Sequence, residues 1–393
     1  MYSNNNRRQL SSIGRLRAGF TLLEFLLASS IMLIVIVGSL SLYIKSNQVT
    51  VDQQQFAELQ HDVRSSMFLI SRDVRSTGVG ISAEIAGYFL EGKDGLGPSP
   101  DSSDSIKIMG NFEDPLNLKI QQYQEGGGVD TAYLYDSELE KNSYGCPDYY
   151  ENRTYLIVST TNPGCFVFRF VSNDSVLGCG GGPDQLNFQS GKSELSPPGG
   201  LIDTGCAGNC WDDGIITIAQ VKQYWLDTTG NPGDYPDLNL TKGEDGYLGI
   251  PYTLYLTTTN TIGDIIHMPL ARNIENLQFQ YNGDFNQDGL LDGFSDWDNL
   301  NWTINPTDDQ LTKQTKSERI SQIRQVRFWI LGKTRDLFVS VSKTPSTNVH
   351  LYRRPAIANV PAGSKDDRHR RFLLESTANV RNLSLNIYNT GER

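Results

Sequence analysis

The feature that most constrains this chain is an unbroken apolar stretch close to its N-terminus. From position 20 to position 44 the sequence reads FTLLEFLLASSIMLIVIVGSLSLYI, and Glu24 is its only ionisable side chain. As a helix it would reach about 37 Å, enough to cross a hydrocarbon layer of about 30 Å. Residues 1–19 hold arginines and no acid, so they should stay in the cytoplasm. The sequence therefore predicts one membrane-crossing helix, with everything after Lys45 facing outward.

The position of Gly19 separates this leader from an ordinary secretory signal, which would be cut after the apolar stretch. Gly19 stands before the stretch, where its uncrowded backbone suits a peptidase. The run Gly19-Phe20-Thr21-Leu22-Leu23-Glu24 resembles the processing motif of type IV prepilins and type II secretion pseudopilins. The resemblance implies removal of residues 1–19 by prepilin peptidase, through cleavage between Gly19 and Phe20, and N-methylation of Phe20.

Glu24 has two readings. The resemblance implies that it pairs with the N-terminal amine of a neighbouring subunit during assembly. A carboxylate near the start of a helix is also favoured by the helix dipole and can reach the headgroup layer. We favour the assembly role, because an ionisable residue within an apolar span is usually functional.

The helix is expected to continue beyond the membrane, over residues 45–78. Apolar residues recur there at steps of three and four, which predicts one apolar stripe that packs on a folded domain rather than a coiled coil. The pattern ends at Gly78-Val79-Gly80, a plausible C-terminal cap, so the helix should run from Phe20 to about Thr77. The stripe consists of Phe56, Leu59, Val63, Met67, Ile70 and Val74.

Residues 79–393 have the pattern of a β-rich extracytoplasmic domain. Short β-branched and aromatic runs alternate with Gly, Pro, Asn and Asp, which predicts a mostly antiparallel sheet docked on the long helix, an α+β fold. Two segments, around 91–150 and 174–214, are expected to be irregular insertions. The predicted strands are 155–158, 165–170, 215–225, 252–257, 274–281, 323–331 and 379–388.

Several segments resemble the PilW-like minor pilins. The resemblance covers the N-terminal motif and, more loosely, the end of the helix, two later strands and the closing segment; the insertions fall outside it. These later matches are Arg72 to Gly78, Ile274 to Tyr281, Gln325 to Leu331, Arg368 to Arg371, and Thr377 to Asn382.

One acidic loop has the spacing of a calcium site. Asp284, Asn286 and Asp288 take the first, third and fifth places, Gly289 provides the turn, Leu290 offers a carbonyl, and Asp292 takes the ninth. The twelfth place holds Ser295 instead of a bidentate glutamate, so Asp296 or Asp298 would have to substitute. The alternative is an Asx-rich turn between strands. We expect calcium here, and a solvated turn at the acidic loop around residues 234–245.

The cysteines cluster in the middle of the chain, where an extracytoplasmic location would allow disulfides that brace the insertions. Their odd number leaves one free or paired elsewhere. The Cys206–Cys210 spacing is one residue too long for a redox or zinc knuckle. The disulfide candidates are Cys146, Cys165, Cys179, Cys206 and Cys210.

No intact catalytic motif is present in the sequence, so we expect that the chain is not an enzyme.

These observations and the resemblance together predict a minor pilin that helps to start type IV pilus assembly, at or near the pilus tip. The alternatives are a type II secretion pseudopilin and a tip adhesin. The implied partners are other minor and major pilins, through the helix, and the inner-membrane assembly platform. The chain would lie in the inner membrane before assembly and in the pilus afterwards. A net charge of −11 argues against a general nucleic-acid binder.

Overall fold

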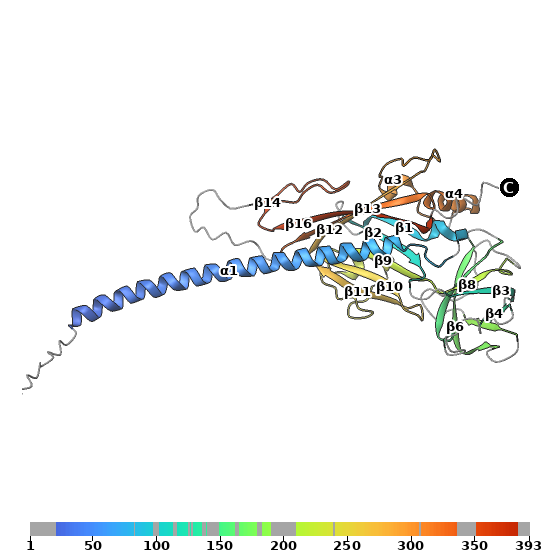
Figure 1. Cartoon of the computed structure of the whole chain (residues 1–393), viewed down its shortest axis with the longest axis horizontal. Coiled ribbons are helices and arrows are strands. Elements are labelled where there is room, and N and C mark those ends of the chain that lie inside the picture. The colour runs from blue at the N-terminus through green and yellow to red at the C-terminus, as the bar shows by residue number, and fades with distance from the viewer. Residues whose placement is uncertain are drawn as a thin grey trace, which may run out of the picture. The chain divides into compact units, whose positions relative to one another are not determined.

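The fold begins with one long helix and continues in antiparallel strands (Figure 1). In the computed structural model the chain forms two compact units, Met1–Gln54 and Gln55–Arg393. The structure describes residues 21–81, 83–96, 102–112, 116–124, 126, 129–135, 139, 149–161, 165–178, 183–189, 210–238, 240–305, 308–335 and 351–383.

Helix α1 spans Leu22–Arg75, 54 residues, which confirms the predicted continuous helix. Its end follows from the sequence: Gly78 adopts φ +73°, which costs glycine little, and its N–H leaves the helix to donate to the Met109 carbonyl at 2.8 Å. The predicted apolar stripe is buried from Leu59 to Val74, with Phe56 partly buried at its start. This half of α1 therefore belongs to the core of the second unit.

Two sheets pack with this half of α1 in one hydrophobic core. All their strand pairs are antiparallel, and the strand orders are β1-β2-β9-β10-β11 and β12-β13-β16. The strands of the first sheet are β1 (Leu90–Leu96), β2 (Ser103–Gly110), β9 (Gln220–Asp227), β10 (Thr253–Thr259) and β11 (Ile265–Arg272). Those of the second are β12 (Ile274–Gly283), β13 (Ile323–Lys333) and β16 (Arg371–Asn379).

Side chains of β2 join the two sheets. The Leu277 N–H of β12 donates to Ser103 Oγ at 3.2 Å, and the Phe279 N–H donates to Asp104 Oδ2 at 2.9 Å. These donors lie on a sheet edge, so the β2 side chains take the place of a neighbouring strand.

Six further strands form a closed antiparallel barrel with a hydrophobic core of its own. One ion pair lies among the apolar side chains: Arg169, 1% exposed, donates through Nε to Asp130 at 3.2 Å. The barrel order is β3-β4-β7-β6-β5-β8. Its strands are β3 (Asn117–Gln124), β4 (Val129–Leu134), β5 (Arg153–Val158), β6 (Phe166–Leu177), β7 (Gln185–Gln189) and β8 (Ile215–Thr217).

Short elements complete the described chain. The two-residue strands Tyr352–Arg353 (β14) and Asp366–Asp367 (β15) pair with each other. The remaining helices are η1 (Ala83–Tyr88), η2 (Pro232–Asp234), η3 (Pro236–Leu238), α3 (Trp297–Leu300) and α4 (Gln310–Ile320). The mostly antiparallel α+β architecture agrees with the sequence prediction.

Two local predictions were wrong. The segments 91–150 and 174–214 are not irregular throughout, because they supply most of β1, all of β2, β3 and β4, and β7. The last predicted strand, 379–388, is misplaced: the strand is β16, which ends at Asn379 opposite Gln325, and residues 382–383 form a helical turn. Its partner β13 begins at Ile323, so little partner strand remains beyond Asn379. Residues 384–388 lie outside the described residues.

Candidate functional site

The helix N-terminus carries a reciprocal cap built from Thr21 and Glu24. The Thr21 N–H and the Thr21 hydroxyl both donate to Glu24 Oε2 at 2.9 Å, and the Glu24 N–H donates to Thr21 Oγ1 at 3.3 Å. This is a capping box, in which the residue three places into the helix satisfies the backbone of the first. Within the single chain, Glu24 therefore acts as a carboxylate at the helix start, the alternative to the assembly role.

The helix beyond this cap exposes apolar side chains on all sides. In the stretch of greatest hydropathy no residue is buried, and the helix is long and apolar enough to cross a membrane. So large an exposed apolar surface is unfavourable in water, and a helix of this length and composition could span a membrane. Gly19 and Phe20, the expected processing residues, lie outside the described residues.

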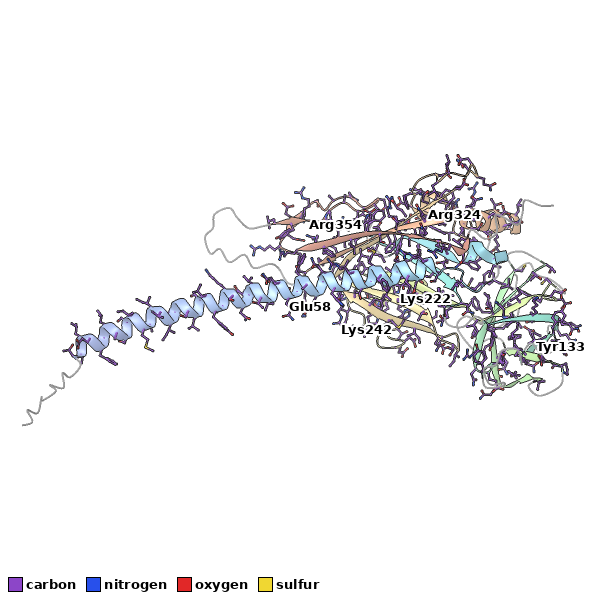
Figure 2. All side chains as sticks on the ribbon, in the orientation of Figure 1. Glu58, Tyr133, Lys222, Lys242, Arg324 and Arg354 are labelled. Carbon is purple, nitrogen blue, oxygen red and sulfur yellow. The ribbon has the colours of Figure 1, made fainter. Side chains whose placement is uncertain are left out.

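A buried carboxylate ties the far end of α1 to the first sheet. Asp73, 2% exposed, accepts from the Tyr224 hydroxyl at 2.7 Å and from Lys222 Nζ at 3.0 Å, both on β9. Arg72 contributes a further hydrogen bond at 2.9 Å. Figure 2 shows Lys222 beside the C-terminal part of α1.

The surroundings of Asp73 keep it ionised. Burial alone would raise its pKa, but the hydrogen bonds from Tyr224 and Arg72 and the charge of Lys222 hold that pKa below its ordinary value. This anchor was not predicted from the sequence. The only local signal was an acid between two arginines at the end of the helix, since its two partners lie far along the chain.

The aspartate loop after β12 folds into a tight turn held by its own side chains. Asp284 Oδ1 accepts from the Asp288 N–H, and Asp284 Oδ2 accepts from the Gly289 N–H, both at 3.0 Å. Asp292 closes the loop by accepting from the Phe285 N–H at 2.6 Å. Gly289 adopts φ +85°, as the sequence required of its turn position. This one turn thus contains the candidate calcium ligands Asp284, Asn286, Asp288 and Asp292.

Asp296 makes its contacts elsewhere, with Gln280 at 3.0 Å and Asn299 at 3.3 Å. Ser295, at the twelfth place, pairs its backbone with Tyr281. Within the described part of the chain, no group of three or more histidine, cysteine or acidic side chains could hold a metal ion. An ion in this loop would therefore depend on the Asn286 amide and the Leu290 carbonyl as well.

Two carboxyls that were not predicted as site residues lie near Asp296: Asp104 is buried and Asp94 is half-buried. Burial and neighbouring acids raise the pKa of Asp104 to about 8 and that of Asp94 to about 6. Both have structural partners: Asp104 bridges the two sheets, and Asp94 accepts from the Trp297 and Asp298 N–H groups at the start of α3. These carboxyls therefore serve as caps for backbone donors.

The cysteines are described only in part. Cys165 is buried and disulfide-bonded, as the extracytoplasmic assignment leads one to expect. The backbone carbonyl of Cys210 accepts from the Ser159 and Thr161 hydroxyls. Cys146, Cys179 and Cys206 lie outside the described residues, so the pairing stays a prediction.

The chain matches no protein-family model, no curated protein and no solved structure. Its functional assignment therefore rests on its own residues and their arrangement.

Proposed function

We propose that this chain is a PilW-like minor pilin of a type IV pilus, which helps to start pilus assembly and occupies a place at or near the tip. The observation that carries the proposal is the exposed apolar helix, which has Glu24 in its first turn and continues without a break into a β-rich domain. Such a helix can lie in the inner membrane before assembly and in a bundle of like helices afterwards. The chain would have no catalytic role.

The proposed mechanism divides α1 into two working parts. Prepilin peptidase would remove residues 1–19, and the assembly platform would move the apolar part from lipid into the filament. There it would contact other minor and major pilins through apolar packing. The second part, anchored through Asp73 to Lys222 and Tyr224, would transmit the position of the helix to the β-domain.

Glu24 would change partners during assembly. In the single chain its carboxylate caps its own helix through Thr21. In the filament it would pair with the N-terminal amine of a neighbour, which stabilises a charge that apolar surroundings would otherwise penalise.

The two roles of Glu24 can be separated by substitution. Glu24→Gln keeps the capping box, because glutamine serves at this position too, but it removes the charge. Glu24→Ala removes both. If Glu24 pairs with an amine, both variants should stay membrane-bound yet lose incorporation into sheared pili, as measured by immunoblotting. Full incorporation of Glu24→Gln with failure of Glu24→Ala would instead assign Glu24 to capping alone.

The pilus proposal itself is tested with a strain that lacks this chain. Surface pili are counted by electron microscopy, secreted enzymes are assayed in the medium, and attachment is scored in a strain locked against retraction. Loss of pili with normal secretion supports the minor pilin. Lost secretion with intact pili would make it a type II pseudopilin. Normal numbers of pili with lost attachment would point to a tip adhesin.

We also propose that the aspartate loop binds calcium. What supports this is the tight turn around Gly289 and the spacing of Asp284, Asp288 and Asp292 at places one, five and nine. An ion held by the folded state alone would stabilise it by about 2.7 kcal/mol at one hundred times the dissociation constant.

Chelation of calcium from the full chain in detergent should therefore lower its melting temperature by a few degrees. Asp284→Ala should remove this response, whereas Asp234→Ala, in the other acidic loop, should retain it. If the melting temperature of the unaltered chain is the same with and without calcium, the site is refuted.

A further inference from the structure

A cavity of about 440 Å³ lies beside the first sheet, among side chains from distant parts of the chain. Its volume falls within the range of small-molecule sites, about 300–1,000 Å³. The wall residues come from η1, the strands β1, β2, β6, β9, β10 and β11, and the segment that runs from Trp297 to Ile320. One wall is fixed tightly: a Cβ on Gly87 of η1 would lie 2.1 Å from Ser317 Oγ of α4.

Aromatic rings dominate the lining. Tyr88 and Phe166 meet edge to face with centroids 4.9 Å apart, and Trp297 and Trp302 do so at 5.7 Å. Phe168 adds a fifth ring, at 6.4 Å from Phe166. Rings held in this way have fixed faces and edges, which favour another ring as their neighbour.

The polar groups of the cavity are largely engaged in contacts within the protein. Across the sheet, Glu91, Lys107, Gln223 and Thr257 form one row of paired residues. Lys107 Nζ and Glu91 Oε2 are 2.6 Å apart, so the two charges cancel. Thr257 Oγ1 already accepts from Trp225 Nε1 at 2.8 Å.

The neighbouring row of paired residues, which includes Thr259 and Ile265, also has few hydrogen-bonding groups to offer a polar ligand. Thr259 Oγ1 accepts from the Val221 N–H at 3.2 Å, and Ile265 pairs with Thr259 from the neighbouring strand. A charged ligand would lose its hydration here without gaining a free counter-charge.

From this lining we propose that the cavity binds a small, neutral, ring-containing apolar molecule. The ring would stack or meet edge to face with Tyr88, Phe166 and the two tryptophans. Its binding energy would come from burial of apolar surface and from ring contacts. This inference stands independently of the pilus assignment.

Indole is a suitable probe, because it is neutral and planar. The full chain in lipid nanodiscs is titrated with indole by isothermal calorimetry, and empty nanodiscs provide the correction for partition. We expect one saturable site. Indole-3-acetate should bind at least about tenfold more weakly, because its carboxylate must lose water beside an ion pair that is already neutral.

Two cavity-filling variants and one matched control locate the site. Val221→Phe and Ile304→Phe each place a ring in the cavity from a different segment, and each should weaken indole binding at least about tenfold. Ile262→Phe makes a similar change on an exposed turn outside the lining and should leave binding unchanged. Circular dichroism establishes which variants are folded. One folded cavity-filling variant is enough to test where indole binds.

Absence of saturable heat with the unaltered chain would overturn the proposal. So would undiminished indole binding by a folded filling variant, because the bound indole would then lie elsewhere. Equal or tighter binding of indole-3-acetate would overturn the assignment to neutral ligands.

Discussion

Replacement of Asp73 by asparagine tests how the long helix is fastened to the β-domain. Asp73 is nearly inaccessible and receives hydrogen bonds from Tyr224, Lys222 and Arg72 at 2.7 to 3.0 Å. Asparagine has the shape of aspartate but only one acceptor oxygen instead of two. Its amide N–H groups would face the donors that the second carboxylate oxygen now accepts from. Lys222, with 14% of its side chain exposed, would lose its counter-charge.

The expected cost follows from these contacts. Hydrogen bonds to charged groups contribute about 1.5–3 kcal/mol, and removal of one partner from a buried ion pair costs about 3–5 kcal/mol. Because Lys222 can partly reach water, we expect Asp73→Asn to lower the free energy of unfolding by about 3 kcal/mol. The double variant Asp73→Asn/Lys222→Met should lose less than the two single losses combined, since no unpaired ammonium remains.

The pH dependence gives a second check. The pKa of Asp73 is lowered in the folded chain, so its contribution is present above the unfolded-state pKa and is lost as the pH falls. The difference between the unaltered chain and Asp73→Asn should therefore shrink from about pH 5 towards about pH 3, around the ordinary aspartate pKa.

The assay is urea unfolding of the full chain in detergent, followed by tryptophan fluorescence. Asp62→Asn, a partly exposed change on the same helix, is the control and should alter stability by less than about 0.5 kcal/mol. A loss below about 1 kcal/mol for Asp73→Asn, or a loss that does not vary with pH, would refute the anchor.

Three further predictions address other buried groups. Asp130→Ala should destabilise the barrel by about 3–5 kcal/mol, because Arg169 stays buried without its partner, whereas the double variant Asp130→Leu/Arg169→Leu should recover much of this loss in thermal unfolding. The pKa of Asp104 is raised to about 8, so the folded chain should lose stability as the pH rises from about 4 to about 8. Asp104→Asn should flatten this dependence of the free energy of unfolding on pH in urea titrations, and an unchanged dependence would exclude Asp104 as its source. Gly332→Val should destabilise the helix docking by about 1–3 kcal/mol, because a Cβ at this position would lie 2.5 Å from Leu59 Cδ1, and an unchanged urea midpoint would show that the core can accommodate it.

The first part of the chain was predictable because its signals are local. Continuous apolarity predicted the span, the repeat of apolar residues at steps of three and four predicted the stripe from Leu59 to Val74, and Gly78 marked the end. The aspartate loop belongs to the same class, since its contacts lie within nine residues of sequence. Helical period and turn chemistry depend only on near neighbours, so a reader of the sequence can recover them.

The arrangement of the β-domain depended on tertiary structure. The sequence around Asp73 does not predict contacts with Lys222 and Tyr224, because these residues lie 149 and 151 positions further along the chain. The strand at Arg371–Asn379 was predicted to begin only at Asn379, because alternation in the sequence does not show where the partner strand lies. The barrel and the aromatic cavity arise only when distant strands meet.

The sequence by itself determined an apolar span whose only ionisable side chain is Glu24, a helical continuation with one buried face, and a β-rich remainder. Tertiary structure alone decided which strands pair, which carboxylates are buried, and which rings surround the cavity. The physical reason is that backbone conformation follows from local preferences, whereas burial and pairing depend on groups brought together by the whole fold.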